Sequence, residues 1–186
     1  GAGLAGMRAT LAAGENGADV AMITKVHPVR SHSNAAQGGI NAALVTRGDD
    51  WEEHAYETIK GSDYLGDQDA IEIMCQDAGR AIIELEHMGV IFSRDDEGRL
   101  GTRRFGGQEK ARTFFVADIT GQALLQVLYE QVVKAGIRIY EEWFVTSLIM
   151  DSGQCHGVVA LDMMTGNLHS IFSKAVILAT GGLGRA

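Results

Sequence analysis

The sequence predicts an α/β fold, and three features support that prediction by their order along the chain. A glycine-rich turn, a helix and a buried strand follow one another in residues 1–23, helical periodicity fills the middle, and short strands occupy residues 137–178. The composition, 46% hydrophobic and 22% charged, is that of an ordinary globular domain. A net charge of −8 argues against a broad surface for nucleic acid or anionic membranes.

The first glycine-rich turn is a G-x-G-x-x-G sequence formed by Gly1, Gly3 and Gly6. In a dinucleotide-binding fold the first glycine makes a tight turn, the second admits a pyrophosphate, and the third lets helix and sheet pack closely. Residues 7–13 are strong helix formers, and residues 18–23 predict the next buried strand. The motif therefore predicts a nucleotide-binding turn, with a glycine-rich terminal loop as the alternative.

An apolar strand is predicted at the other end of the chain, over residues 175–178, and it runs into a glycine cluster. The cluster contains Gly181, Gly182 and Gly184, and an apolar strand that ends in glycines is typical of a ligand-binding sheet edge in α/β proteins. No strand precedes Gly1, and the chain stops just after the cluster. We therefore expect a fragment of a longer protein.

Three helices are predicted between these ends. Asp50 begins a capping-box pattern and predicts a helix to about residue 60, and Asp69 begins a similar pattern for a longer helix to about residue 87. Gly89 is the expected C-cap of the longer helix, and Asp118 is expected to cap a third helix that ends near residue 135. The expected buried stripes are Ile71, Met74, Ala78, Ile82 and Leu85 on the longer helix, and Ala123, Val127, Leu128 and Val132 on the third.

The last part of the chain predicts a β-meander. Strands are expected over residues 137–141, 144–150, 157–163 and 168–172, with a turn at residues 165–167. A βαβ signature, a helical middle and a late meander together describe an FAD/NAD(P)-binding Rossmann-like three-layer fold, in which the meander replaces one crossover helix. We expect this fold to be truncated at both ends.

The segment from Thr24 to Gly39 is predicted to be a long loop that holds the only proline of the chain and a Gly-Gly pair. Long loops without secondary structure inside a compact domain are usually functional. Many dinucleotide-binding proteins carry an acidic residue for the adenosine ribose at the end of the second strand. Thr24 and Lys25 occupy that place here, which weakens any assignment to a nicotinamide cofactor.

Several blocks of sequence are long enough to be specific. They are KVHPVRSHSNAAQGGI at residues 25–40, KGSDYLGDQDA at 60–70, ELEHMG at 84–89, RFGG at 104–107, ADITG at 117–121 and ATGGLGR at 179–185. In this order they resemble the flavoprotein subunit of succinate dehydrogenase and fumarate reductase, and the resemblance extends over essentially the whole chain.

This resemblance implies a bound FAD that is attached covalently through His32 to the 8α-methyl group of the flavin. Outside such a match, His32 would be interpreted as a solvated loop histidine. Gly39 and Phe105 match family segments that approach the dicarboxylate substrate near the flavin ring. The residues implied to contact FAD are Gly1, Gly3, Gly6, Thr24, Lys25, Ser31, His32, Ser33, Gln37, Gly38, Gly39, Thr180, Gly181 and Gly182.

The resemblance also implies hydride transfer between succinate or fumarate and FAD, with electrons passed on to an iron–sulfur subunit. The catalytic arginine of the family and its substrate-binding residues lie beyond residue 186, so we assign no catalytic residue and no metal site to this chain. Residues 1–186 would then be part of an FAD-binding domain, without the capping and C-terminal domains.

The implied partners are the iron–sulfur subunit and the membrane anchor subunits of the complex. Through them the protein would lie at the cytoplasmic face of the bacterial inner membrane or, in a eukaryote, at the matrix side of the mitochondrial inner membrane. Gln37 favours succinate oxidation as the physiological direction, because some fumarate reductases carry glutamate at this place.

Two other hypotheses stay open. L-Aspartate oxidase shares the Gln-Gly-Gly sequence and the Asp-x-Thr-Gly helix start, but it normally lacks a histidine at the place of His32 and binds FAD noncovalently. The third hypothesis is a non-catalytic FAD-binding module or a fragment without independent function. We expect the isolated chain to fold poorly and to bind FAD weakly, because loss of a central parallel strand leaves its neighbours unpaired.

The remaining chemistry-bearing residues have plain structural interpretations. Arg103, Arg104 and Arg112, in an irregular polar stretch over residues 93–112, either steer a dicarboxylate or are solvated positive side chains. Cys75 and Cys155 are expected to be buried small hydrophobic residues. The other histidines, expected to be surface or structural residues, are His27, His54, His87, His156 and His169.

Overall fold

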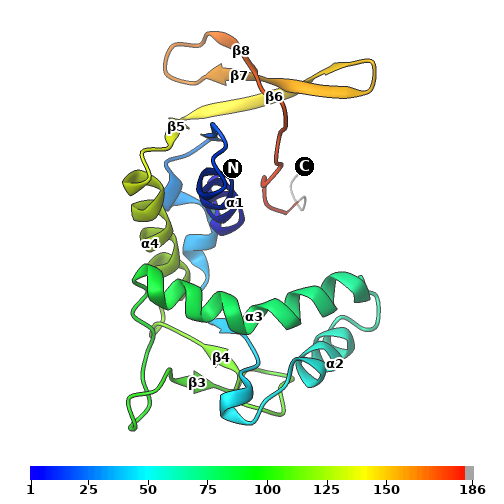
Figure 1. Ribbon diagram of the computed structural model, residues 1–186, viewed down its shortest axis with the longest axis vertical. Helices are drawn as coiled ribbons and strands as arrows, with labels where there is room; N and C mark the ends of the chain where they lie inside the picture. Colours follow the sequence, from blue (N-terminus) through cyan, green and yellow to red (C-terminus); the bar gives the residue numbers. More distant parts are fainter. Residues whose placement is uncertain (183–186) are drawn as a thin grey trace. The chain divides into compact units, whose positions relative to one another are not determined.

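The computed structural model describes residues 1–182, and its contacts divide the chain into two compact units (Figure 1). Unit 1 comprises residues 1–34 together with the chain from residue 125 onward, and unit 2 comprises residues 35–124. The predicted glycine at position 184 lies outside the described residues. The predicted α/β class is confirmed, because both units combine helices with strands.

Unit 1 begins with helix α1, Leu4–Glu15, and strand β1, Ala21–Thr24, as the glycine-rich turn and the apolar run predicted. Met7 and Leu11 of α1 are buried, since their spacing places them on one face of the helix. Strand β1 pairs in parallel with β5, Arg138–Glu141, in a register that runs from Ala21 opposite Arg138 to Thr24 opposite Glu141. A helix followed by a strand that pairs in parallel with a strand distant in the sequence is typical of dinucleotide-binding folds.

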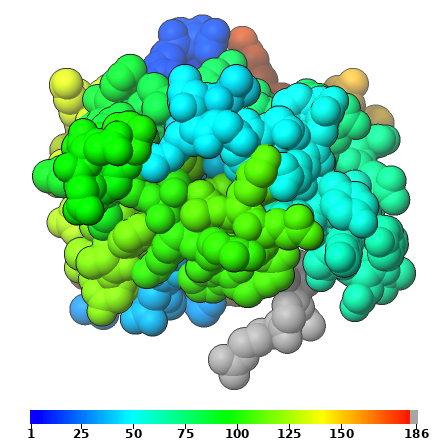
Figure 2. Space-filling view, turned by 90° about the horizontal axis from the view of Figure 1, so that it is seen from below, coloured from blue at the N-terminus to red at the C-terminus, as the bar shows by residue number. Residues whose placement is uncertain are grey.

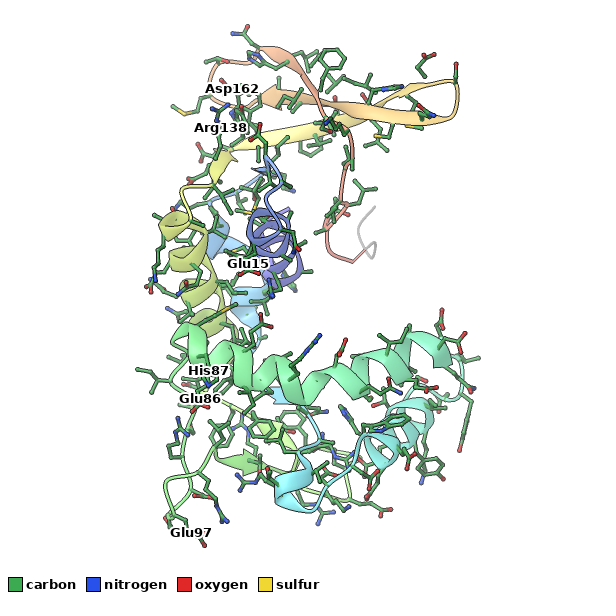
Figure 3. All side chains as sticks on the ribbon, viewed as in Figure 1. Glu15, Glu86, His87, Glu97, Arg138 and Asp162 are labelled. Atoms are coloured by element: carbon green, nitrogen blue, oxygen red, sulfur yellow. The ribbon has the colours of Figure 1, made fainter. Side chains whose placement is uncertain are left out.

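The predicted meander is confirmed in unit 1. Strands β6, Trp143–Asp151, β7, Gln154–Asp162, and β8, Leu168–Phe172, form a three-stranded antiparallel sheet in that order. Ser152 and Gly153, both with positive φ, make the tight turn between the first two strands. The side chain of Asp162 accepts hydrogen bonds from the backbone of Met164 and the hydroxyl of Thr165, which fixes the predicted turn before β8 (Figure 3).

The strand predicted over residues 175–178 is wrong for the described structure. Residues 175–180 carry no strand assignment, and the side chains of Ile177 and Leu178 are 67% and 64% exposed. An apolar run becomes a strand only when a neighbouring backbone pairs with it. No described strand pairs with this run.

Unit 2 is built on two helices, α2, Trp51–Gly61, and α3, Gln68–Met88, which pack against each other. Asp50 caps α2 as predicted, because its carboxylate accepts a hydrogen bond from the backbone N–H of Glu53 at 2.7 Å. The predicted cap of α3 is wrong: Asp67, and not Asp69, accepts from the backbone N–H of Ala70. Asp69 is the second residue of the helix, and its negative charge in the first turn stabilises the N-terminus.

Helix α3 ends at Gly89, whose φ of +118° is the left-handed C-cap conformation that the sequence predicted. The predicted buried stripe of α3 is only partly correct. Ile82 is fully buried, whereas Met74 is 50% exposed. The exposed part of the stripe faces a pocket that is described below, so its apolar spacing reflects a concave surface rather than a packed core.

A small sheet completes unit 2, and the sequence pattern did not predict it. Strands β2, Ile40–Asn41, β4, Thr113–Phe114, and β3, Thr102–Arg103, lie in that order and are antiparallel. Each strand is only two residues long, which is too short to show an alternating pattern. Short 3₁₀ helices occupy Pro28–Arg30, His32–Ala35 and Val45–Arg47.

Helix α4, Thr120–Lys134, begins in unit 2 and continues in unit 1. The predicted stripe is shifted by about one residue. Leu128 and Val132 are buried as predicted, but Leu124 and Leu125 are buried in place of Ala123 and Val127, which are half-buried. The larger leucine side chains bury more apolar area than alanine or valine, so they determine which face of the helix packs inward.

Candidate cofactor site

The N-terminus of α1 is an open anion-binding site. Its N-cap residue is Gly3, which has no side chain to occupy the free backbone N–H groups of the first turn, and the first turn contains no acidic residue. The helix dipole adds partial positive charge at the same place. A phosphate bound there would accept hydrogen bonds from the backbone and be stabilised by the dipole.

Backbone crowding around the motif requires glycine at two of its three positions. A Cβ on Gly6 would lie 1.9 Å from the carbonyl oxygen of Gly1, and a Cβ on Gly1 would lie 2.2 Å from the carbonyl oxygen of Ala179. Neither distance is possible for a real side chain, so the close packing that the motif predicted is present. The contact with Ala179 also brings the predicted Ala179–Gly182 segment to the start of the chain, where Gly181 has a φ of +81°.

Two hydroxyl groups lie beside the glycine motif and, together with the N-terminus of α1, form a surface that we call the cradle. A Cβ on Gly3 would lie 3.0 Å from the Oγ of Ser31 and 3.3 Å from the Oγ of Ser33, and the Ser33 Oγ lies 3.5 Å from the backbone nitrogen of Leu4. The structure therefore brings together, within unit 1, the predicted glycines and both predicted serines. The Leu4 N–H donates to the Ser33 Oγ; the other N–H groups of the first turn, the space that a Cβ would fill and the two hydroxyls fit a pyrophosphate.

His32 is exposed and lies between these two serines, at the first residue of the 3₁₀ helix His32–Ala35. Its side chain is thus accessible beside the cradle. Thr24, at the end of β1, is buried, and its hydroxyl donates to the carbonyl oxygen of Val26 at 2.7 Å, whereas Lys25 is exposed. The end of β1 carries a hydroxyl and an amine in place of the carboxylate that binds a ribose in nicotinamide-binding proteins.

Unit 2 contains the second predicted glycine-rich element, Gln37–Gly39. Gly39 has a φ of +120°, and a Cβ there would lie 2.4 Å from the carbonyl oxygen of Phe114, so this position excludes other residues. A Cβ on Gly38 would lie 3.0 Å from the Cζ of Phe105. The structure therefore places Phe105 directly against the Gly-Gly pair, as expected for residues that share a site.

A pocket of about 660 Å³ opens beside Gly38, Gly39 and Phe105. Helix α3 supplies one apolar wall, and α2 contributes His54 and Thr58. A largely apolar concave surface with a few polar groups is typical of a site that binds a small molecule. The wall residues of α3 are Met74, Asp77, Ala78, Ala81, Ile82 and Leu85.

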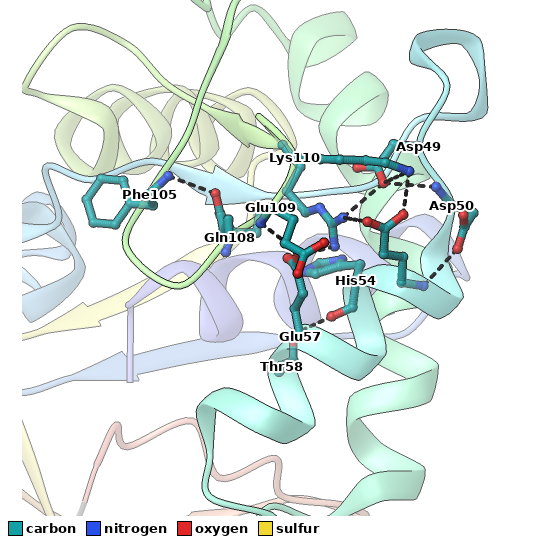
Figure 4. A network of polar contacts seen from close by, with 12 residues as sticks. Asp49, Asp50, His54, Glu57, Thr58, Phe105, Gln108, Glu109 and Lys110 are labelled. Carbon is teal, nitrogen blue, oxygen red and sulfur yellow. Dashed lines mark hydrogen bonds and ion pairs between the residues drawn. The ribbon is translucent and has the colours of Figure 1, made fainter.

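A buried ion cluster lies next to this pocket and was not predicted (Figure 4). Arg112 is fully buried and pairs with Asp49 at 3.0 Å and with Glu57 at 3.2 Å. Lys110 pairs with Glu53 at the outer side of the cluster, and the backbone of Glu109 donates to Glu57. Figure 2 shows this part of unit 2 from outside, with the cyan surface that includes α2 beside the green surface of the segment after α3.

The prediction that Arg112 is solvated or steers a substrate is wrong, because its guanidinium is enclosed by carboxylates. Burying this cation alone would be strongly unfavourable, so the acidic side chains of α2 and Asp49 must fold around it. Arg103 and Arg104 are both engaged with backbone carbonyls, of Gly38 and Gln108 respectively. The sequence does carry one sign of the cluster: Asp49, Glu53 and Glu57 recur at every fourth position, which places them on one side of α2 and of the residues just before it.

His54 is a structural histidine, as predicted, and only 3% exposed. Burial and the nearby Arg112 guanidinium lower the pKa of its imidazole from the ordinary value of 6.5, against the opposing carboxylates of Asp49 and Glu57. The imidazole is therefore neutral over a wider pH range than an exposed histidine. Cys75 is buried as predicted, and burial raises the pKa of its thiol, whereas Cys155 is only half-buried.

Comparison with known proteins places these features in a family. The FAD binding domain model matches residues 1–186, so the chain belongs to the FAD binding domain family. The succinate dehydrogenase flavoprotein subunit of Rickettsia bellii is 50% identical over 100% of this chain and 33% of its own length. The fumarate reductase flavoprotein subunit of Mycobacterium tuberculosis is 45% identical over 100% of this chain and 32% of its own length.

A solved structure of the E. coli quinol fumarate reductase flavoprotein FrdA, carrying one mutation, superimposes with a TM-score of 0.94 at 40% identity. It covers 100% of this chain and 32% of the FrdA chain. The predicted Rossmann-like fold with a meander is thereby confirmed. The chain spans about a third of the length of these relatives. Among residues 1–182, no helix is both long and apolar enough to cross a membrane.

Proposed function

We propose that this chain is the FAD-binding portion of a succinate dehydrogenase or fumarate reductase flavoprotein subunit. The observation that carries the proposal is the cradle at α1, where Gly1, Gly3 and Gly6 meet the hydroxyls of Ser31 and Ser33 beside an exposed His32. Whole-chain identity of 50% to a succinate dehydrogenase flavoprotein subunit supports the same assignment.

The cradle would hold the pyrophosphate of FAD, through the N–H groups at the start of α1 and the two serine hydroxyls. Thr24 and Lys25 would contact the adenosine half, and Thr180, Gly181 and Gly182 would close the site next to Gly1. We propose that Gln37, Gly38 and Gly39 contact the flavin. When bound, FAD supplies the hydride acceptor that the protein side chains lack.

His32 is proposed as the covalent attachment point. It lies between the two serines of the cradle and is exposed, and the first turn of α1 carries no carboxylate. The imidazole can therefore approach the edge of a bound flavin. Covalent attachment would hold the cofactor through turnover and raise its reduction potential.

Gly39 and Phe105 are proposed to lie near a dicarboxylate, succinate or fumarate. They share the pocket of about 660 Å³, and an aromatic ring against a bare peptide offers a flat wall for a small planar substrate. We assign no catalytic residue to residues 1–182, because the family resemblance places the catalytic arginine in a later segment of the subunit. The domain division, with a capping and a C-terminal domain outside this chain, is part of the same proposal.

We further propose that electrons leave through an iron–sulfur subunit, and that anchor subunits hold the complex at a membrane. The cytoplasmic face of a bacterial inner membrane is the proposed location, or the matrix side of the mitochondrial inner membrane in a eukaryote. Both settings occur among the relatives, since the mitochondrial subunit of Oryza sativa and the subunit of Rickettsia bellii are each 50% identical to this chain.

Turnover by the protein expressed from its full-length gene tests the proposal against L-aspartate oxidase. We expect dye reduction with succinate and none with L-aspartate, and Gln37 favours succinate oxidation over fumarate reduction. Turnover of L-aspartate without turnover of succinate would assign the chain to the second enzyme instead. Stoichiometric FAD with neither activity would leave a binding module.

A further inference from the structure

The Arg103 side chain forms hydrogen bonds with the backbone of the Gly38–Gly39 segment of unit 2. Its guanidinium donates to the carbonyl oxygen of Gly38 from Nε at 3.1 Å and from Nη2 at 2.5 Å, and Nη2 also donates to the carbonyl oxygen of Gln37 at 3.0 Å. These hydrogen bonds join residues that are 65 and 66 positions apart in the sequence. A charged donor makes them stronger than bonds between neutral groups.

The guanidinium is itself fixed by aromatic rings. Its Cζ lies 4.4 Å from the ring centroid of Phe115 and 5.8 Å from that of Phe105. Phe105 in turn fills the space where a Cβ of Gly38 would be. One arginine therefore contacts both the backbone of the glycine pair and the ring that packs against it.

Arg103 does not line the pocket, whereas Gly38, Gly39 and Phe105 do. The opposite side of the glycine pair is fixed by β4, because Gly39 approaches the carbonyl oxygen of Phe114 too closely for any Cβ. The segment is thus held between a strand and a guanidinium. A wall fixed on both sides presents one geometry to whatever binds in the pocket.

The same contact polarises the Gly38–Gly39 peptide. No cis peptide is present among the described residues, so the N–H of Gly39 points away from the carbonyl that Arg103 binds. A cation that donates to the carbonyl draws electron density from the amide and makes that N–H a stronger donor.

We propose that Arg103 is a positioning residue for the flavin–dicarboxylate reaction, and this inference rests on the function proposed above. It sets the geometry and the polarity of the Gly38–Gly39 peptide without touching cofactor or substrate. The role requires arginine, because a lysine ammonium cannot form the planar double contact and stack on Phe115 at the same time.

The experiment compares Arg103→Gln and Arg103→Lys in the enzyme expressed from its full-length gene. Arg104→Gln is the matched control, because the neighbouring guanidinium bonds the carbonyl oxygen of Gln108 and does not contact the glycine pair. Three quantities are measured for each protein: kcat and KM for succinate, the visible absorption spectrum of the bound flavin, and the thermal unfolding midpoint.

We expect kcat to fall about ten- to a hundredfold in both Arg103 variants, with KM changed by less than about threefold, because geometry rather than ground-state binding is lost. The flavin absorption band should shift in both, and Arg104→Gln should match the wild type. If Arg103→Gln does not fold, Arg103→Lys carries the test with the same expected loss.

Wild-type kcat and an unshifted flavin spectrum in Arg103→Gln would overturn the proposal. Full recovery of both quantities in Arg103→Lys would also overturn it, since charge alone would then suffice. If the wild type does not oxidise succinate, the proposed function fails, and the flavin spectra of Arg103→Gln and Arg104→Gln still decide the positioning role.

Discussion

The two glycine-rich sites of this chain are held in different ways. In unit 1, backbone contacts backbone within a six-residue motif, to which Ala179 and the hydroxyls of Ser31 and Ser33 add contacts. In unit 2, the Gly38–Gly39 pair is held by side chains from a segment more than sixty residues away, above all Arg103. A site built from local backbone is visible in a sequence, whereas a site built from distant side chains becomes visible only after folding.

The two units also differ in their polar interiors. Among the described residues, unit 2 buries the Arg112 guanidinium among carboxylates. The cradle of unit 1 instead has backbone N–H groups at the start of α1 that could bind an anion. In the first arrangement the charges are compensated within the protein, whereas the second arrangement fits an anionic ligand. Substitutions in unit 2 should therefore act mainly on stability, and substitutions in the cradle mainly on FAD affinity.

The largest effect is expected at Arg112. Arg112→Met in the full-length protein should destabilise unit 2 by about 3–5 kcal/mol, because it leaves Asp49 and Glu57 buried without their cation. Arg80→Met is the control, since the exposed Arg80–Asp77 pair should contribute only about 0.5 kcal/mol. Denaturant unfolding measures both, and equal midpoints would show that the cluster does not stabilise the unit.

The cradle is tested by Gly6→Ala. Its new Cβ would lie 1.9 Å from the Gly1 carbonyl oxygen, so the motif must shift, with a cost of about 1–3 kcal/mol and loss of tight FAD binding. Gly14→Ala lies on the same helix, where the Cβ would make ordinary contacts with Ile137 at 3.4 Å and Val20 at 3.8 Å, and should stabilise the protein by about 0.5–1 kcal/mol. FAD titration measures the effect on affinity, and thermal unfolding measures the effect on stability. Unchanged FAD affinity in Gly6→Ala would show that the cradle does not bind FAD.

A smaller effect is expected from pH through His54. Its pKa is lowered in the folded protein by burial and by Arg112, so the unfolded chain binds a proton more readily below the ordinary value of 6.5. Stability is thus fully present above pH 6.5 and decreases as the pH falls from 6.5 toward the lower folded pKa. His54→Gln should flatten this slope in denaturant midpoints measured between about pH 7.5 and 5.5, and an equal slope in both proteins would contradict the assignment.

The sequence predicted α1, β1, the meander and the helix caps at Asp50 and Gly89, because each depends on residues close together in the chain. It did not predict the sheet β2–β4–β3, whose two-residue strands form only where distant segments meet. Conversely, the sequence predicted a strand at residues 175–178 that the structure lacks, because apolar character alone does not supply a pairing partner.

The candidate site divides in the same way. The structure brings the glycines of the cradle close to the two serines and places Phe105 against Gly38, while their contacts with FAD and substrate stay predictions. Arg112 was misjudged because a single sequence does not show that Asp49, Glu53 and Glu57 surround it. The role of Arg103 depends on carbonyl groups, which every residue carries, and no residue type marks it in advance.

We propose that the cradle of unit 1 and its neighbouring histidine hold FAD covalently in a succinate dehydrogenase or fumarate reductase flavoprotein. Acid precipitation of the full-length protein is the decisive experiment, with His32→Ser as the paired variant. We expect flavin fluorescence in the wild-type pellet and, for His32→Ser, flavin only in the supernatant. Release of all wild-type flavin into the supernatant would show that His32 does not bind FAD covalently.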